Sequence, residues 1–152
     1  MATSRKTIRK AIGAALKTAL EGTGKPAQAV YDHLPILFKA SPVLCVASSG
    51  TKTTRKGIGG TTGFNLFRFQ LMMFQVVPNT ANGWNAADAQ DAQDDLEMAV
   101  RDWVVDNPTN ANWKHLRFVN GDGAFTEIIP VKVGGEEYDL ETIEIEVEVY
   151  DT

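Results

Sequence analysis

Few residues in this chain have the chemistry of a catalytic or metal site. The only cysteine is Cys45, and the two histidines, His33 and His115, lie far from each other in the sequence. A zinc site needs several His, Cys or carboxylate ligands at characteristic spacings, and no such cluster occurs here. Catalysis by Cys45 with either histidine as base is conceivable, but this cysteine lies in an apolar stretch typical of an inert, buried thiol. We therefore predict neither metal ligands nor a cysteine nucleophile.

Motifs for phosphate binding and for a serine nucleophile are incomplete. Gly24 and Lys25 resemble the end of a phosphate loop, but Pro26 replaces the required Ser or Thr, and Ala19 replaces the first Gly. The glycine-rich residues 57–60 do not precede a helical pattern, and no serine lies in a Gly-x-Ser-x-Gly pattern. We therefore predict no catalytic residue and no cofactor, and interpret the chain as a structural or interaction protein.

Charge is distributed unevenly along the 152 residues, although the net charge is only −4. Residues 1–60 contain ten Lys or Arg and two acidic residues, whereas residues 127–152 contain one Lys and nine acidic residues. Opposite charges can compensate within one fold or join neighbouring copies head to tail. The basic half could also contact nucleic-acid phosphates, but the chain as a whole is acidic and no aromatic residues interleave with its basic stretches.

Two segments have helical periodicity. Residues 4–20 begin at a capping serine, Ser4, and carry a basic face, while residues 86–106 begin at a capping asparagine, Asn85, and carry an acidic face. The acids Asp91, Asp94 and Asp95 lack the spacing of a calcium-binding loop, so we interpret them as a solvated helix face.

Several strands are predicted between and after the helices. Short strands are expected over residues 29–33 and 42–47, a long one over 64–77, and a β-meander over 113–150 with strands at 113–119 and 125–133. Gly134 and Gly135 mark a hairpin, and the final strand alternates apolar residues with Glu144, Glu146 and Glu148. The order predicts one α+β domain spanning 1–152, with a mainly antiparallel or mixed sheet packed against two helices.

The long strand and the loop before it have contrasting compositions. Both faces of residues 64–77 are largely apolar, which predicts a central strand covered on both sides. One core is expected to contain Phe67, Phe69, Leu71, Leu96, Val100, Trp103, Ile145 and Val147. Residues 48–63 are rich in Gly, Ser and Thr and carry three cations, Lys52, Arg55 and Lys56, so they predict a mobile loop.

Four features in order resemble the tail terminator, or tail-completion, proteins of long-tailed bacteriophages. The first is a short strand at Val30-Tyr31 followed by Leu34-Pro35 and Ser41–Val43, and the second is a polar loop at Ser48–Thr51 before the aromatic strand Phe64–Phe69. The third is an acidic, alanine-rich helix that contains Ala89–Glu97 and Val104–Asn107 and precedes Trp113–Leu116. The fourth is the hairpin Val133–Tyr138, with Glu141 before the final strand. Together they span about residues 4–150. The loop extension, residues 52–63, does not match the family pattern.

This resemblance implies a subunit of a homohexameric ring at the head-proximal end of the virion tail, assembled in the host cytoplasm. The ring would cap the tail tube, end its polymerisation and join the tail to the neck of the capsid. The implied partners are other copies of the chain, the major tail tube protein and a head–neck connector, with DNA passing through the lumen without sequence-specific binding. No catalytic residue, metal or cofactor is implied, and no membrane is involved.

Two surfaces are predicted to carry these contacts. Lys52, Arg55 and Lys56 are expected to meet the tail tube or neck, and Glu144, Glu146 and Glu148 a basic surface of the next subunit. Two alternatives stay open: another ring-forming head–tail connector, such as an adaptor or stopper, and a nucleic-acid-binding module that uses the basic half.

Overall fold

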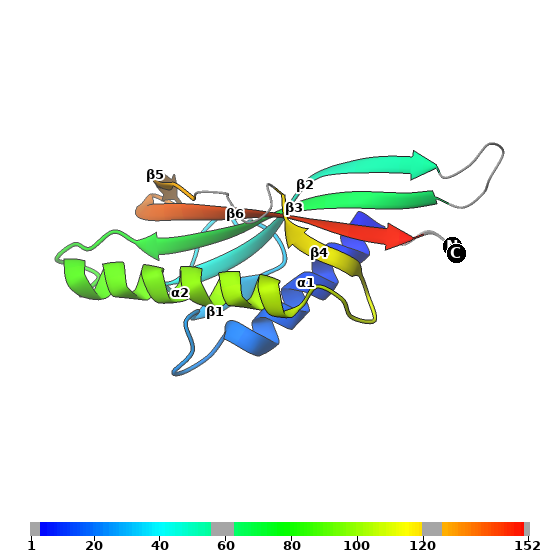
Figure 1. Ribbon diagram of the computed structural model, residues 1–152. Helices are drawn as coiled ribbons and strands as arrows, with labels where there is room; N and C mark the ends of the chain where they lie inside the picture. The colour runs from blue at the N-terminus through cyan, green and yellow to red at the C-terminus, as the bar shows by residue number, and fades with distance from the viewer. Residues whose placement is uncertain (1–3, 56–62, 120–125, 151–152) are drawn as a thin grey trace.

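Two helices and a curled mixed sheet make up the fold, described by a computed structural model over residues 4–55, 63–119 and 126–150 (Figure 1). Helix α1 spans Arg5–Leu20 and α2 spans Ala86–Asp106. The strands are β1 (Ala29–Tyr31), β2 (Val43–Arg55), β3 (Gly63–Val76), β4 (Lys114–Phe118), β5 (Ile128–Val133) and β6 (Glu136–Tyr150). The predicted α+β class is confirmed. No helix among the described residues is both long and apolar enough to cross a membrane.

Both helices begin where the sequence predicts. The side chain of Ser4 accepts a hydrogen bond from the backbone N–H of Thr7 at 3.1 Å, and that of Asn85 accepts one from Asp88 at 2.8 Å. Each bond satisfies one of the backbone donors that a helix leaves unpaired at its start. Asp88 also places a negative charge in the first turn of α2, where the helix dipole favours it.

The strands follow the order β1-β2-β3-β6-β4, and β5 pairs with the same edge of β6 as β4. Strand β1 is parallel to β2, and the other pairings between the described strands are antiparallel. The predicted hairpin between β5 and β6 is confirmed, with Gly134 and Gly135 at φ 59° and 84°. A two-residue turn with both φ angles positive matches the twist of the strands it joins, and glycine adopts it without strain.

Strand β2 is much longer than predicted, and the loop predicted over residues 48–63 is wrong for 48–55. These residues pair with β3 up to the end of β2, with one irregularity between Ser48 and Gly50. The polar composition of this stretch argues against burial but not against pairing, because the backbone of β3 supplies the hydrogen-bond partners. Thr51 and Thr53 are β-branched and suit an extended strand. The remainder of the predicted loop, 56–62, lies outside the described residues.

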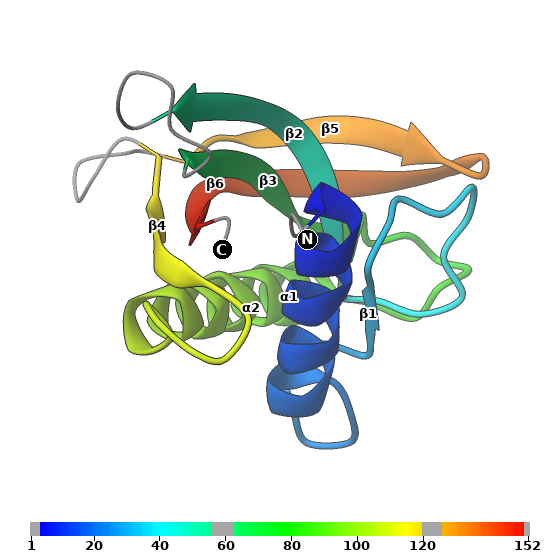
Figure 2. The ribbon, with the colours of Figure 1, turned by 90° about the vertical axis from the view of Figure 1, so that its right-hand side faces the viewer.

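The predicted core is confirmed. All eight predicted residues belong to one buried cluster between the helices and one face of the sheet. Figure 2 shows both helices on this side, crossing each other beneath the strands. Ile8, Ile12 and Leu16 of α1 enter the same cluster and are fully buried. The helices therefore cover this face of the central strands and leave the opposite face to other segments.

The opposite face of the sheet is covered only in part. Phe38 packs there, with its ring centroid 4.7 Å from Phe74 and 5.2 Å from Tyr138. Farther along β3, on the same face, the Arg68 side chain is 48% exposed. The prediction that β3 is covered on both sides thus holds for its C-terminal part and is wrong near Arg68.

Candidate interaction surfaces

The predicted glutamate face lies on the outer side of β6, where a row of charges crosses the sheet. Register places Gly50, Arg68, Glu146 and Arg117 side by side on four strands. Arg117 Nε donates to Glu146 Oε1 at 2.9 Å, and Arg68 Nε lies 3.5 Å from Glu146 Oε2. The carboxylate of Glu146 is thus held between two guanidinium groups. These charges offset the cost of burying it, since Glu146 is only 8% exposed.

The two neighbouring glutamates also have partners within the chain. Arg117 Nη2 donates to Glu148 Oε1 at 3.1 Å, and Ser49 Oγ donates to Glu144 Oε1 at 3.2 Å. Burial raises the pKa of Glu148, but hydrogen bonds from Tyr150 and Arg117 outweigh burial and hold that pKa below its ordinary value. Arg68 and Arg117 thus supply part of the positive charge that we expected from a neighbouring subunit. Contact between this face and another subunit stays a prediction.

The three cations predicted to bind a partner are only partly described. Lys52 is exposed on β2, opposite Leu66 of β3. Arg55 is the last residue of β2, and Lys56 lies outside the described residues. Beside Lys52, a shallow hollow of about 350 Å³ is lined by Ser49, Leu66, Arg68 and others. Its open, mixed polar and apolar surface suits a protein contact better than an enclosed small-molecule site.

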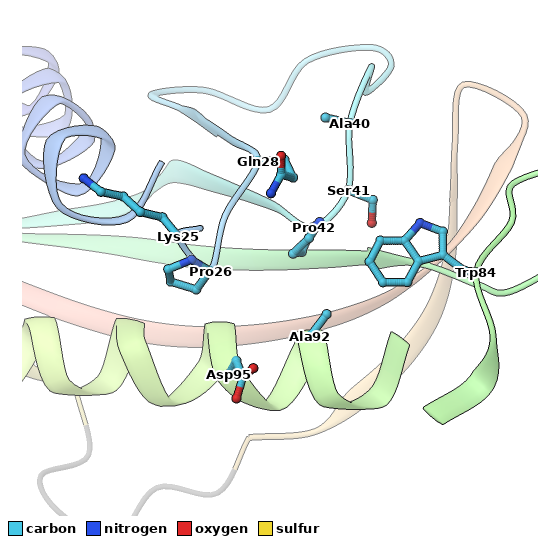
Figure 3. A pocket seen from close by; sticks show the side chains of 9 residues that line it. All are labelled: Lys25, Pro26, Gln28, Ala40, Ser41, Pro42, Trp84, Ala92 and Asp95. Atoms are coloured by element: carbon cyan, nitrogen blue, oxygen red, sulfur yellow. The ribbon is translucent and has the colours of Figure 1, made fainter. Parts of the chain in front are cut away.

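A second hollow, of about 460 Å³, lies between α2 and the segments that flank β1 (Figure 3). Pro26, Pro42 and Trp84 form apolar walls, and Asp95 lies on the helix side. Lys25 points away toward α1, where its Nζ donates to the carbonyl oxygen of Thr18 at 2.9 Å. Ser41 also lines the hollow, and its Oγ accepts a hydrogen bond from the backbone N–H of Val76 at 2.9 Å; among the described residues no hydrogen bond joins it to a basic side chain.

The three residues considered for metal or cysteine chemistry are not brought together. Cys45 is buried in β2, and burial raises its pKa to about 12, so the thiolate is scarce at neutral pH. His33 is exposed, and its Nδ1 lies 2.9 Å from Asp32 Oδ1. His115 is also exposed, in β4, where the pairing with β6 is irregular between Lys114 and Arg117. Within the described ranges, no group of three or more His, Cys, Asp or Glu could hold a metal ion.

Sequence reasoning missed the buried acid Glu141. It lies on the helix-facing side of β6, is 7% exposed and accepts a hydrogen bond from the hydroxyl of Thr126. Burial raises the pKa of Glu141, the Thr126 bond opposes this, and Glu97 and Asp94 of α2 raise it further. The sequence could have indicated this burial, because successive side chains of a strand point to opposite faces. Glu141 therefore points to the same face as Ile143 and Ile145.

No protein-family model matches this chain, and no curated protein matches its sequence. Its own residues and fold must therefore support any functional proposal.

Proposed function

We propose that this chain is the subunit of a ring that caps the tail tube of a long-tailed bacteriophage, as the resemblance to tail terminator proteins implies. In this proposal the protein has no catalytic role. The ring ends tube polymerisation and presents its other side to the head–neck connector.

The observation that carries this proposal is that the two helices, which cover different halves of the sheet, have opposite charge. Helix α1 packs on β1 and β2 and contains cations but no acidic residue. Helix α2 packs on β3 and β4, in the other half of the sheet, and contains seven acidic residues and one arginine. Two different surfaces of opposite charge favour head-to-tail contacts, which close into a ring when the rotation between copies allows.

The charges on the two helices are not compensated by each other. Among the described residues, the ion pairs of the helices are local, joining Lys17 to Glu21 and Arg101 to Glu97. No ion pair within the described ranges joins α1 to α2. For the two helices this favours contact between copies, whereas Glu146 and Glu148 of β6 are compensated within the chain by Arg68 and Arg117.

The β2–β3 hairpin is a suitable contact for the tail tube. In Figure 1 the paired ends of β2 and β3 extend beyond α2, away from the helix-covered core. Thr51 on this extension accepts a hydrogen bond from Arg5 at 3.1 Å, which ties it to the start of α1, and Lys52 beside it is exposed. A tethered, exposed strand pair can offer backbone and charged groups to a partner without disturbing the core.

Negative-stain imaging of the purified protein, alone and with the tail tube protein of the same phage, tests the proposal. We expect six-fold rings, free or at one end of each tube, and shorter tubes when the protein is present during polymerisation. Rings that bind the portal side of the neck but ignore tubes would indicate another head–tail connector. A stable dimer under all conditions, with tube length unchanged, would contradict the ring proposal.

A further inference from the structure

Three lysines form a stripe along one side of α1. Residues four and eleven positions apart lie on the same side of a helix, and the stripe spans about 16 Å. All three are exposed, and within the part of the chain that the structure describes only Lys17, at one end, forms an ion pair, with Glu21 at 3.9 Å. We define the lysine stripe as Lys6, Lys10 and Lys17.

Three aspartates form a stripe with the same spacing on α2. We define the aspartate stripe as Asp91, Asp95 and Asp102. All three are exposed, and they lie opposite the buried side of the helix that carries Leu96 and Val100. The same exposed side also presents Met98, 58% exposed, and Val105, 63% exposed. None of the three aspartates forms an ion pair with another described residue, and large apolar side chains beside such acids are typical of a surface that contacts protein.

We propose that the lysine stripe of one copy packs along the aspartate stripe of a second copy. The positions i, i+4 and i+11 match in number, spacing and opposite charge, so parallel helices can bring all three pairs together. The stripes lie on helices that pack on different halves of the sheet, so one stripe is available to each of two neighbouring copies in a head-to-tail contact. The inference rests on the proposed ring and specifies its subunit contact, in place of the glutamate face of β6.

Charge reversal provides the test. One variant carries Lys6→Glu, Lys10→Glu and Lys17→Glu; the reciprocal variant carries Asp91→Lys, Asp95→Lys and Asp102→Lys. A 1:1 mixture of unlabelled and ¹⁵N-labelled protein is treated with a carbodiimide, which joins lysines to carboxylates in direct contact, and mass spectrometry identifies links between copies. In the wild type we expect links between the two stripes. Each variant alone should lose assembly by about tenfold or more, since three attractions become repulsions.

Rescue separates a specific contact from general effects of charge. Mixing the two reciprocal variants, or combining all six substitutions in one chain, should restore assembly. The control Lys25→Glu with Lys39→Glu and Lys132→Glu changes the net charge by the same amount as the lysine-stripe variant. It should assemble as the wild type does. The circular dichroism spectrum of each variant checks that the variant is folded.

The outcomes distinguish this contact from the function of the ring. Rings or capped tubes without stripe-to-stripe links would overturn the inference and leave the proposed function standing. Stripe-to-stripe links without rings or tube capping would support the contact and contradict the function. A lysine-stripe variant that assembles normally but no longer binds duplex DNA at low salt would overturn the inference and assign the stripe to a polyanion. Absence of any links between copies, at all concentrations and with tubes added, would also overturn it.

Discussion

Replacing Gly13 by alanine tests how closely α1 packs against the residues that follow β1. Gly13 is buried within α1, and an added Cβ would lie 2.7 Å from the Cβ and 3.2 Å from the Cα of Asp32. Alanine is favoured over glycine inside a helix by about 1 kcal/mol. An extra carbon in a well-packed site costs about 1–3 kcal/mol. Because the contacted atoms adjoin the backbone and cannot easily move, packing should prevail, and the free energy of unfolding should fall by about 1 kcal/mol.

Urea unfolding followed by the fluorescence of buried Trp103 and Trp113 measures this change. Ala14→Gly, at the exposed neighbouring position, is the matched control and should lose about 1 kcal/mol through helix propensity alone. Asp32→Gly in the Gly13→Ala background removes the nearest atom, so the cost of the alanine should shrink in the double variant. If Gly13→Ala instead stabilises the protein by about 1 kcal/mol, α1 is not held against Asp32 and the reasoning is refuted.

Three further predictions concern the core, a buried acid and the hairpin cations. Leu96→Ala should lower the free energy of unfolding by about 2–5 kcal/mol, and a loss below about 0.5 kcal/mol would show that this side chain is not buried. Burial raises the folded-state pKa of Glu141 above its ordinary 4.5, so its favourable contribution at low pH is lost as pH rises through that folded-state pKa. Glu141→Gln should therefore flatten the pH dependence of urea unfolding above pH 4.5, and an unchanged slope would contradict this. Replacing Lys52, Arg55 and Lys56 together by Ser should change stability by less than about 0.5 kcal/mol yet produce overlong or unjoined tails in complementation, whereas normal infectious particles would remove these cations from the mechanism.

The sequence predicts best those elements whose signals are local. The helix starts follow from Ser4 and Asn85, whose side chains can cap only the residues that come directly after them. The face of β6 follows from strict alternation, and the β5–β6 hairpin from two consecutive glycines. In each case the determining residues lie within one turn or one strand, so no knowledge of distant segments is required.

The second half of β2 shows what local signals cannot predict. Residues 48–55 have the composition of a loop, and their strand structure depends on pairing with β3. The same is true of the pairs around Glu146, because Arg68 and Arg117 reach it only through the register of three strands distant in sequence. A single sequence indicates that the outer face of β6 is acidic but does not indicate which cations neutralise it.

These cross-strand pairs change which charges argue for assembly. The uneven distribution of charge along the sequence suggested that the acidic C-terminal end would attract a neighbouring subunit. In the fold, the glutamates of β6 share two arginines and a serine within their own chain, while the helices have only local ion pairs in the described ranges.

Exposed, unpaired charges gain more from an incoming partner than charges already held in hydrogen bonds, since breaking or burying a satisfied pair incurs a desolvation cost. The helix layer is therefore the stronger candidate for contact between copies, and the outer sheet face with its β2–β3 extension is left available for the tube. If this division is correct, raising the salt concentration should weaken contact between subunits before it affects folding, because exposed charges are screened and the apolar core is not.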